Sequence, residues 1–169
     1  MLKPNYRVKQ FYLCITDKMD IHDKIFIEKY LNKTELKLFK KLSDHEQKHS
    51  VRVAYGVQSI YLNKYKGKIN LNRLVKVSLL HDIGKIYCKL NAIDKSVLVI
   101  FDILSKGRLK KLDGIKKINI YYNHAERGYN LLKGKGYDPE FLYLVRNHHN
   151  LDIEDNIELN ILRMCDNIN

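Results

Sequence analysis

Histidine and aspartate residues form the most informative chemical pattern in this 169-residue sequence. Five of the seven histidines and two of the aspartates lie in or near predicted helices or their ends. Neutral imidazoles and carboxylates hold divalent first-row metals, and a His/Asp set without thiolates suits iron, manganese, zinc, cobalt or nickel. In chain order the seven residues are His49, His81, Asp82, His124, His148, His149 and Asp166.

The adjacent pair His81 and Asp82 gives this pattern its centre. A carboxylate has two oxygens, so Asp82 can bridge two metal ions if other ligands lie on both sides of it. The remaining histidines and Asp166 are available for those positions. The sequence therefore indicates a site for one or two divalent metal ions.

The elements that position these residues are predicted to be helices, because apolar residues mostly recur three and four apart and only two prolines interrupt the chain. Ser43 and Glu46 form a capping-box pattern, which predicts that a long helix begins there. His49 lies on the same stripe of that helix as Val53 and Val57, so we expect it to point inward. The fold class is accordingly all-α.

Further helices are predicted along the rest of the chain. One runs from Leu71 to about Ile83 and ends near Gly84, a residue that tolerates the left-handed conformation of helix ends. Residues 97–101 are rich in β-branched side chains, so a short strand is an alternative there. The other predicted helices are Ser96 to Leu104, Ile115 to Leu132, Asp138 through Val145 with Pro139 in the first turn, and Ile157 to Asp166 after an Asn156 cap.

The ordered set of residues resembles the HD superfamily of metal-dependent phosphohydrolases, and in particular its HDIG group. The signature is present as His81-Asp82-Ile83-Gly84-Lys85. The segment His49-Ser50-Val51-Arg52-Val53-Ala54 is similar to the first ligand helix of that family, and His124-Ala125-Glu126-Arg127-Gly128 to its fourth-helix ligand motif. The resemblance extends from about Ser43 to Asp166 and implies one compact bundle of about six to eight helices.

The resemblance implies a role for each residue of the pattern. One metal would be held by His49, His81, Asp82 and Asp166, and the second by Asp82, His124, His148 and His149. Iron or manganese is favoured, with zinc, nickel and cobalt as alternatives, and metal-activated water would cleave a phosphomonoester or phosphodiester. Asp82 and Lys85 would be catalytic. Lys85 and Arg52 each follow a ligand by three residues, so we expect both to contact the substrate phosphate.

Two features depart from defined branches of this superfamily. Members of the HD-GYP branch, which cleave cyclic di-GMP, carry a Gly-Tyr-Pro element after the His-His doublet, and its absence here argues against that substrate. Some members place a glutamate one turn before the first histidine, where this chain has His45 next to Glu46. A structural role is the default for His45 and His22, and participation of His45 in the site is the alternative.

Composition limits the class of protein. We expect residues 1–42 to be a helical extension packed on an HD-type metal-binding domain of residues 43–169. The three cysteines form no CxxC pair, no stretch is both long and apolar enough to cross a bilayer, and no signal peptide is recognisable. We therefore expect a cytoplasmic protein without a membrane partner. The net charge of +12 favours an anionic partner, although the many lysines are equally consistent with a compositional bias.

Three interpretations of function follow. The leading one is a hydrolase acting on a phosphorylated small molecule or nucleotide. The second is an inactive metal-binding domain that regulates or senses a nucleotide. The third, less favoured because no nucleic-acid motif accompanies the charge, is a basic RNA-binding protein with structural histidines. The sequence carries no signal for an oligomeric state.

Overall fold

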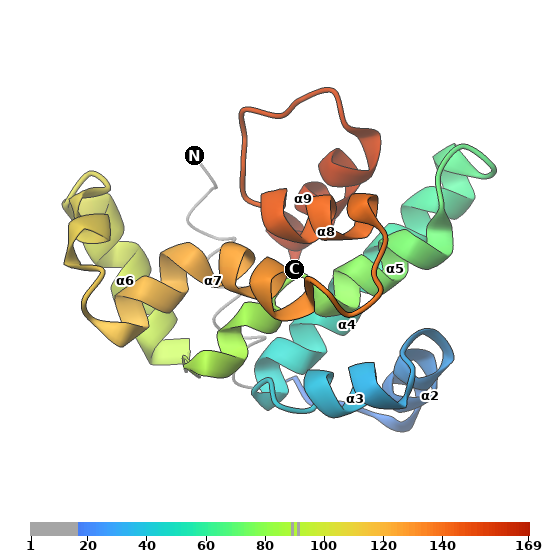
Figure 1. Ribbon diagram of the computed structural model, residues 1–169, viewed down its shortest axis with the longest axis horizontal. Coiled ribbons are helices and arrows are strands. Elements are labelled where there is room, and N and C mark those ends of the chain that lie inside the picture. Colours follow the sequence, from blue (N-terminus) through green and yellow to red (C-terminus); the bar gives the residue numbers. More distant parts are fainter. Residues whose placement is uncertain (1–16, 89, 91) are drawn as a thin grey trace.

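The computed structural model describes residues 17–88, 90 and 92–169, and in these residues it contains eight α-helices and no strand (Figure 1). The all-α prediction is confirmed. The helices are α2 (Ile21–Tyr30), α3 (Lys33–Phe39), α4 (Asp44–Ile60), α5 (Leu71–Leu80), α6 (Ala92–Leu104), α7 (Lys116–Leu132), α8 (Pro139–Asn147) and α9 (Ile157–Ile168). Shorter helical turns are η1 (Tyr61–Tyr65), η2 (Ile83–Tyr87) and η3 (Arg108–Leu112).

Helices α4 and α5 form the centre of the bundle, with α8 and α9 on one side of them and α2 and α3 on the other (Figure 1). Their facing side chains are fully buried, among them Val53 and Val57 of α4 and Leu74 and Val77 of α5. These residues recur three and four apart, which is the spacing that places apolar side chains on one helix face. The predicted inward stripe of α4 is therefore confirmed for Val53 and Val57.

The start of α4 is as predicted, but the capping box is wrong. Ser43 is the N-cap residue, yet its side chain makes no capping hydrogen bond. Its hydroxyl Oγ instead lies 3.1 Å from Nδ1 of His45. Glu46 is turned inward and is buried, so neither side chain of the pattern is available to the backbone at this helix start.

The end of α5 also differs from the prediction. The α-helix stops at Leu80, His81 is its C-cap, and Asp82 adopts φ −93° and ψ 9° before the tighter turn η2 begins. Gly84 lies inside η2 and has no left-handed backbone. Its role is close packing, because a Cβ atom at Gly84 would lie 2.0 Å from the backbone oxygen of His124 and 2.7 Å from the backbone nitrogen of Gly128.

The caps of the last two helices are confirmed. Asp138 accepts a hydrogen bond from the Phe141 backbone at 2.9 Å, and Asn156 accepts one from the Leu159 backbone at 2.8 Å. The strand alternative at residues 97–101 is wrong, because these residues lie within α6. The preference of β-branched residues for strands is outweighed there by apolar residues spaced three and four apart, which is the spacing of a helix.

Residues 17–42 contribute α2 and α3, and this segment buries Ile27, Leu31, Phe39 and Leu42 in the same core as α4 and α5. The expectation of an N-terminal helical extension remains a prediction for residues 1–16, including Phe11 and Tyr12, which lie outside the described residues. Across the part of the chain that the structure describes, no helix combines the length and the apolar character needed to cross a membrane.

Candidate metal centre

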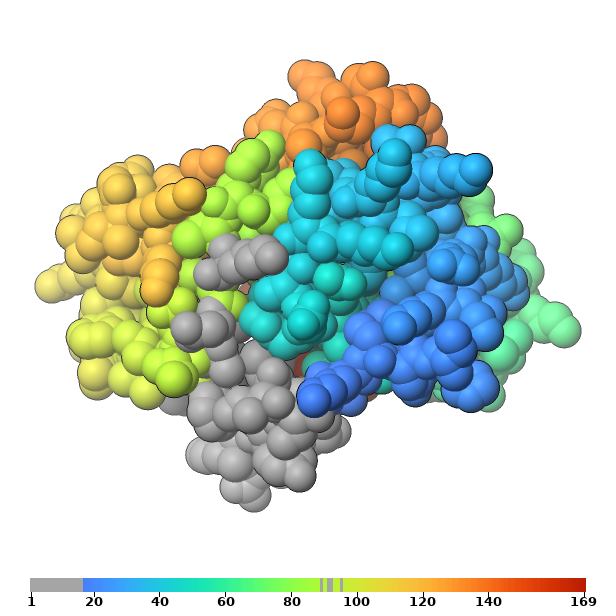
Figure 2. Space-filling view, turned by 90° about the horizontal axis from the view of Figure 1, so that it is seen from below, coloured from blue at the N-terminus to red at the C-terminus, as the bar shows by residue number. Residues whose placement is uncertain are grey.

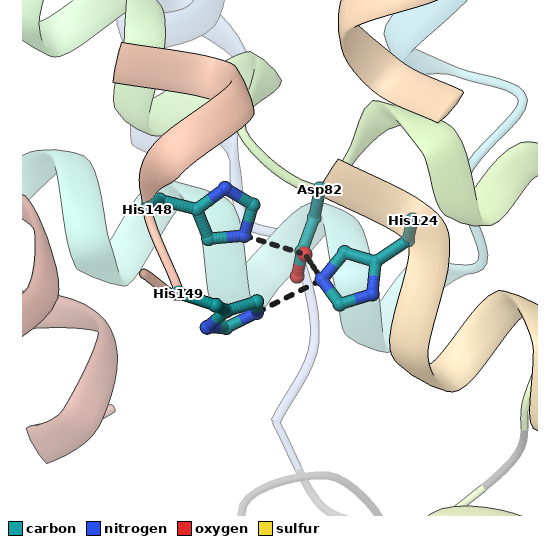
Figure 3. A group of neighbouring side chains, drawn as sticks. All are labelled: Asp82, His124, His148 and His149. Atoms are coloured by element: carbon teal, nitrogen blue, oxygen red, sulfur yellow. Dashed lines mark hydrogen bonds and ion pairs between the residues drawn. The ribbon is translucent and has the colours of Figure 1, made fainter. Parts of the chain in front are cut away.

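The structure brings the seven predicted ligand residues together in two adjacent groups. Helix α4 provides His49, the end of α5 provides His81 and Asp82, α7 provides His124, and α9 provides Asp166. His148 and His149 follow α8. One group comprises Asp82, His124, His148 and His149 (Figure 3), and the other comprises His49, His81 and Asp166; within each, one candidate ligand atom per residue lies within 4.8 Å of the others.

Three buried histidines are oriented by their own backbones. Each imidazole Nδ1 donates a hydrogen bond to a carbonyl three or four residues earlier, so that in the neutral ring Nε2 is the nitrogen with the lone pair. Carbonyl bonds of this kind fix the tautomer and ring orientation in metal sites. The acceptors are Ser78 O for His81 (2.8 Å), Val145 O for His148 (2.7 Å), and Ile120 O and Tyr121 O for His124 (3.1 and 3.0 Å).

The Asp82 carboxylate lies between the two groups. Its Oδ1 lies 3.1 Å from Nε2 of His124 and 3.8 Å from Nε2 of His148. Its Oδ2 lies 3.4 Å from Nε2 of His81 and 3.9 Å from Nε2 of His49. Each oxygen therefore faces a different group, which is the geometry that a bridging carboxylate requires.

Several polar atoms at this centre lack the hydrogen bonds that burial normally demands. Among the described residues, Nε2 of His81 and Nε2 of His148 are buried without a hydrogen-bond partner, and Oδ1 of Asp82 makes no hydrogen bond of normal geometry. An unsatisfied buried polar group costs about 1 to 3 kcal/mol. Because all three atoms are good metal donors, a divalent cation of the iron, manganese or zinc type fits their chemistry.

The protonation states differ between the two groups. Burial, reinforced by the neighbouring imidazoles, holds the pKa of His148 well below its usual value, and partial burial and the His124 imidazole lower the pKa of the half-exposed His149 to about 4. Burial also disfavours a charged His81, but the Asp82 and Asp166 carboxylates outweigh it and raise the pKa of His81 to about 10. His148 and His149 are therefore neutral donors at neutral pH, while His81 carries a proton that a cation would have to displace.

The two carboxylates of the centre are ionised. Burial alone would raise the pKa of Asp82, but Lys85 and His81 hold it well below the ordinary aspartate value. Burial acts in the same direction on Asp166, but the hydrogen bond with His49 and the nearby His81 imidazole lower its pKa well below that value. His49 Nε2 lies 2.9 Å from Asp166 Oδ1.

The His148-His149 doublet turns both imidazoles toward the centre because the helix ends just before it. Neighbouring residues on a regular helix project about 100° apart. Here α8 ends at Asn147, and His148 is its C-cap. Nε2 of His149 consequently lies 2.9 Å from Nε2 of His124, and the His149 side chain is 52% exposed, at the edge of the centre (Figure 3).

The two predicted phosphate-contacting cations lie beside the centre and are already paired. The Lys85 ammonium forms an ion pair with Asp82 Oδ2 and lies 3.5 Å from Glu46 Oε2. Arg52 is ion-paired with Asp17 and lies 3.3 Å from the backbone oxygen of Asn169. Their contact with a substrate phosphate remains a prediction.

Two acidic residues near the site were not assigned to it from the sequence. Glu46 is buried, and its two oxygens lie near Lys85 and near His45, whose Nε2 is 3.5 Å away. Asp17 pairs with Arg52 and lies before the first described helix. Glu46 was noted in the sequence as the neighbour of His45, but the capping pattern assigned its side chain to the backbone. No pattern in the sequence pointed to Asp17.

The sequence analysis also missed Arg163, which orients the segment that carries the doublet. Arg163 lies on α9, is buried, and donates to backbone carbonyls rather than to a carboxylate. The acceptors are Asn147 O (3.3 Å), Asn150 O and Ile153 O (2.6 Å). These carbonyls flank His148 and His149, so Arg163 fixes the path of the chain on both sides of them.

Comparison with known proteins agrees with this geometry. A family model described as HD domain matches residues 47–169. Neither curated proteins nor solved structures yield a match to the chain. The narrower HDIG assignment stays a prediction. Because the family match covers well over half of the chain and includes all seven residues of the centre, the chain belongs to the HD-domain family, a hydrolase superfamily.

Proposed function

We propose that this protein is a metal-dependent phosphohydrolase that cleaves a phosphomonoester or phosphodiester of a nucleotide-like substrate. The observation that carries the proposal is the set of buried imidazoles whose Nδ1 atoms bond to backbone carbonyls and whose Nε2 atoms face Asp82. Donor atoms fixed in this way are preorganised for a cation. Membership of the HD-domain family supplies the reaction class.

In this proposal His49, His81, Asp82 and Asp166 hold one cation, and Asp82, His124, His148 and His149 hold a second. Divalent cations, with iron or manganese favoured, supply Lewis acidity that lowers the pKa of water and neutralises charge on a phosphoryl oxygen.

Lys85 orients the Asp82 carboxylate through its ion pair and offers its ammonium group to an incoming phosphate. Arg52 lies one turn of α4 from His49 and would bind the phosphate by exchanging its Asp17 partner. The net charge of +12 favours approach of an anionic substrate.

A screen of phosphomonoesters, phosphodiesters and nucleotides with added manganese tests the proposal. We expect metal-dependent turnover by the wild type and none by Asp82→Ala. His22→Ala is the matched control, because His22 is exposed and lies outside both groups. A protein that binds metal and turns over no member of the screen would contradict the proposal.

One observation favours a second candidate, a metal-binding regulatory domain without turnover. The Lys85 ammonium pairs with Asp82 Oδ2, the oxygen that faces His49 and His81, and therefore competes with a cation for that oxygen. Lys85→Gln separates the two functions. If the protein is a phosphohydrolase, the Lys85→Gln substitution lowers kcat. If it is a regulatory domain, the substitution tightens metal binding, and neither the wild type nor the variant shows turnover.

A further inference from the structure

Residues 92–117, which comprise α6, η3 and the first residues of α7, form a lobe at one end of the molecule; we call it the α6 lobe. Figures 1 and 2 show this segment in yellow-green to amber, at the opposite end from α2. Among the described residues, eight of the seventeen exposed large hydrophobic side chains lie in it. They are Ile93, Val97, Ile100, Phe101, Ile103, Leu104, Leu112 and Ile115.

Four of these side chains form a continuous stripe along α6. Ile93, Val97, Ile100 and Leu104 are spaced four, three and four residues apart, which places them on one helix face. They are 65%, 42%, 55% and 73% exposed, respectively. The other side of α6 packs on the bundle through Leu98, which is buried beside α7. A whole apolar face of α6 is thus in contact with water, and exposed apolar surface of this kind marks an interaction site.

Basic side chains flank both ends of the stripe. Lys106 and Arg108 follow Leu104 directly, and both are exposed. At the other end, a 2.6 Å ion pair between Lys117 and Asp94 holds the start of α7 beside the first turn of α6, next to Ile93. The lobe, residues 92–117, contains seven Lys or Arg and three Asp, which gives it a net charge of +4.

We propose that the α6 lobe binds an anionic lipid surface, with the apolar stripe in the interfacial layer and the flanking cations on lipid phosphates. Both features are needed for reversible binding in the plane of a membrane, and neither requires a helix that spans it. The earlier expectation of no membrane partner rested only on the absence of a spanning segment.

Other partners account for less of this surface. A second copy docked on the stripe would bring two segments of the same positive charge together, which disfavours association. A nucleic acid would pair with the cations but would leave the apolar stripe in water. A lipid surface satisfies both, and the proposal is independent of the proposed hydrolase function because it uses no residue of the metal centre.

Co-sedimentation of the full chain with phosphatidylcholine vesicles, with and without phosphatidylglycerol, tests the proposal. We expect binding to the anionic vesicles only, weakened by salt. Lys106→Gln/Arg108→Gln should reduce the affinity roughly 30-fold, since each basic residue contributes about fivefold. Ile93→Ser/Ile100→Ser should abolish binding. Controls are Ile21→Ser/Ile25→Ser, which removes apolar side chains of matching exposure from α2, and Lys64→Gln/Lys66→Gln, which removes exposed charges elsewhere.

Three results would overturn the proposal. The first is no sedimentation with either vesicle, and the second is sedimentation that the stripe variant leaves unchanged. The third is a concentration-dependent mass in analytical ultracentrifugation without lipid that the stripe variant abolishes, because it would assign the stripe to a second copy of the chain.

Discussion

Replacing Gly84 by alanine tests whether the contact between η2 and α7 sets the geometry of the metal centre. The added Cβ would lie 2.0 Å from the backbone oxygen of His124 and 2.7 Å from the backbone nitrogen of Gly128. Ordinary van der Waals contact begins at 3.4 Å, so α7 would have to move by about 1.4 Å (3.4 minus 2.0). Both obstacles are backbone atoms of a helix, and no side-chain rotation relieves them.

The expected loss of stability follows from this clash. Overpacking a core usually costs about 1 to 3 kcal/mol, and a clash against backbone on two sides belongs at or above the upper end of that range. With a typical dependence on urea, about 3 kcal/mol lowers the unfolding midpoint by roughly 1 to 3 M. The same movement displaces His124, so we also expect weaker metal binding.

Equilibrium urea unfolding followed by circular dichroism measures this loss, with two matched glycine variants beside it. Gly114→Ala should be nearly neutral, because a Cβ there has no neighbour within 4 Å. Gly128→Ala should lie between the two, since its closest contacts are 3.3 to 3.5 Å and a mid-helix alanine recovers about 1 kcal/mol of helix propensity. A Gly84→Ala protein as stable as the Gly114→Ala protein would refute the reasoning.

Three further predictions follow from the site and its supporting elements. Arg163→Lys should weaken metal binding at the His148-His149 group by roughly tenfold or more, because a contact that orients the ligands is lost. Arg146→Lys, at an exposed arginine of α8, should leave metal binding unchanged. Equal metal titrations for both variants would exclude an orienting role for Arg163. Metal affinity should rise as the pH rises toward about 10, because a cation must displace the proton that the carboxylates hold on His81. Calorimetry in buffers of different ionisation enthalpy counts the released protons. A metal affinity that does not change with pH would contradict the prediction. Asp138→Ala should lose about 1 kcal/mol of unfolding free energy with the removal of the α8 N-cap, and an unchanged thermal midpoint would contradict it.

The sequence predicted the helices well where apolar spacing and capping residues agree. Asp138 and Asn156 cap the helices that they were expected to cap, because a side chain that satisfies the first backbone amides acts locally. Ser43 shows the limit of the same rule. Its hydroxyl lies beside His45 instead, which is a local contact, and Glu46 is buried near Lys85, which is a tertiary contact.

The grouping of the candidate ligands was implied by the resemblance to the HD superfamily, whereas the contacts that orient them could not be anticipated. Gly84 was expected to end a helix through its backbone freedom, but its lack of a side chain is what admits α7 beside it. Arg163 is one of 31 basic residues, and its bonds to carbonyls of a distant segment exist only in the folded chain. The expected phosphate contacts of Lys85 and Arg52 rest on spacing alone and stay predictions.

Metal content per chain is the most direct test of the central claim. The protein is purified, reconstituted with manganese or iron, and measured by elemental analysis beside Asp82→Ala and His22→Ala. We predict about two ions per chain in the wild type and in His22→Ala, and their loss in Asp82→Ala, whose carboxylate faces both groups. A wild-type protein that holds no metal after reconstitution, or an Asp82→Ala protein that retains both ions, would contradict it.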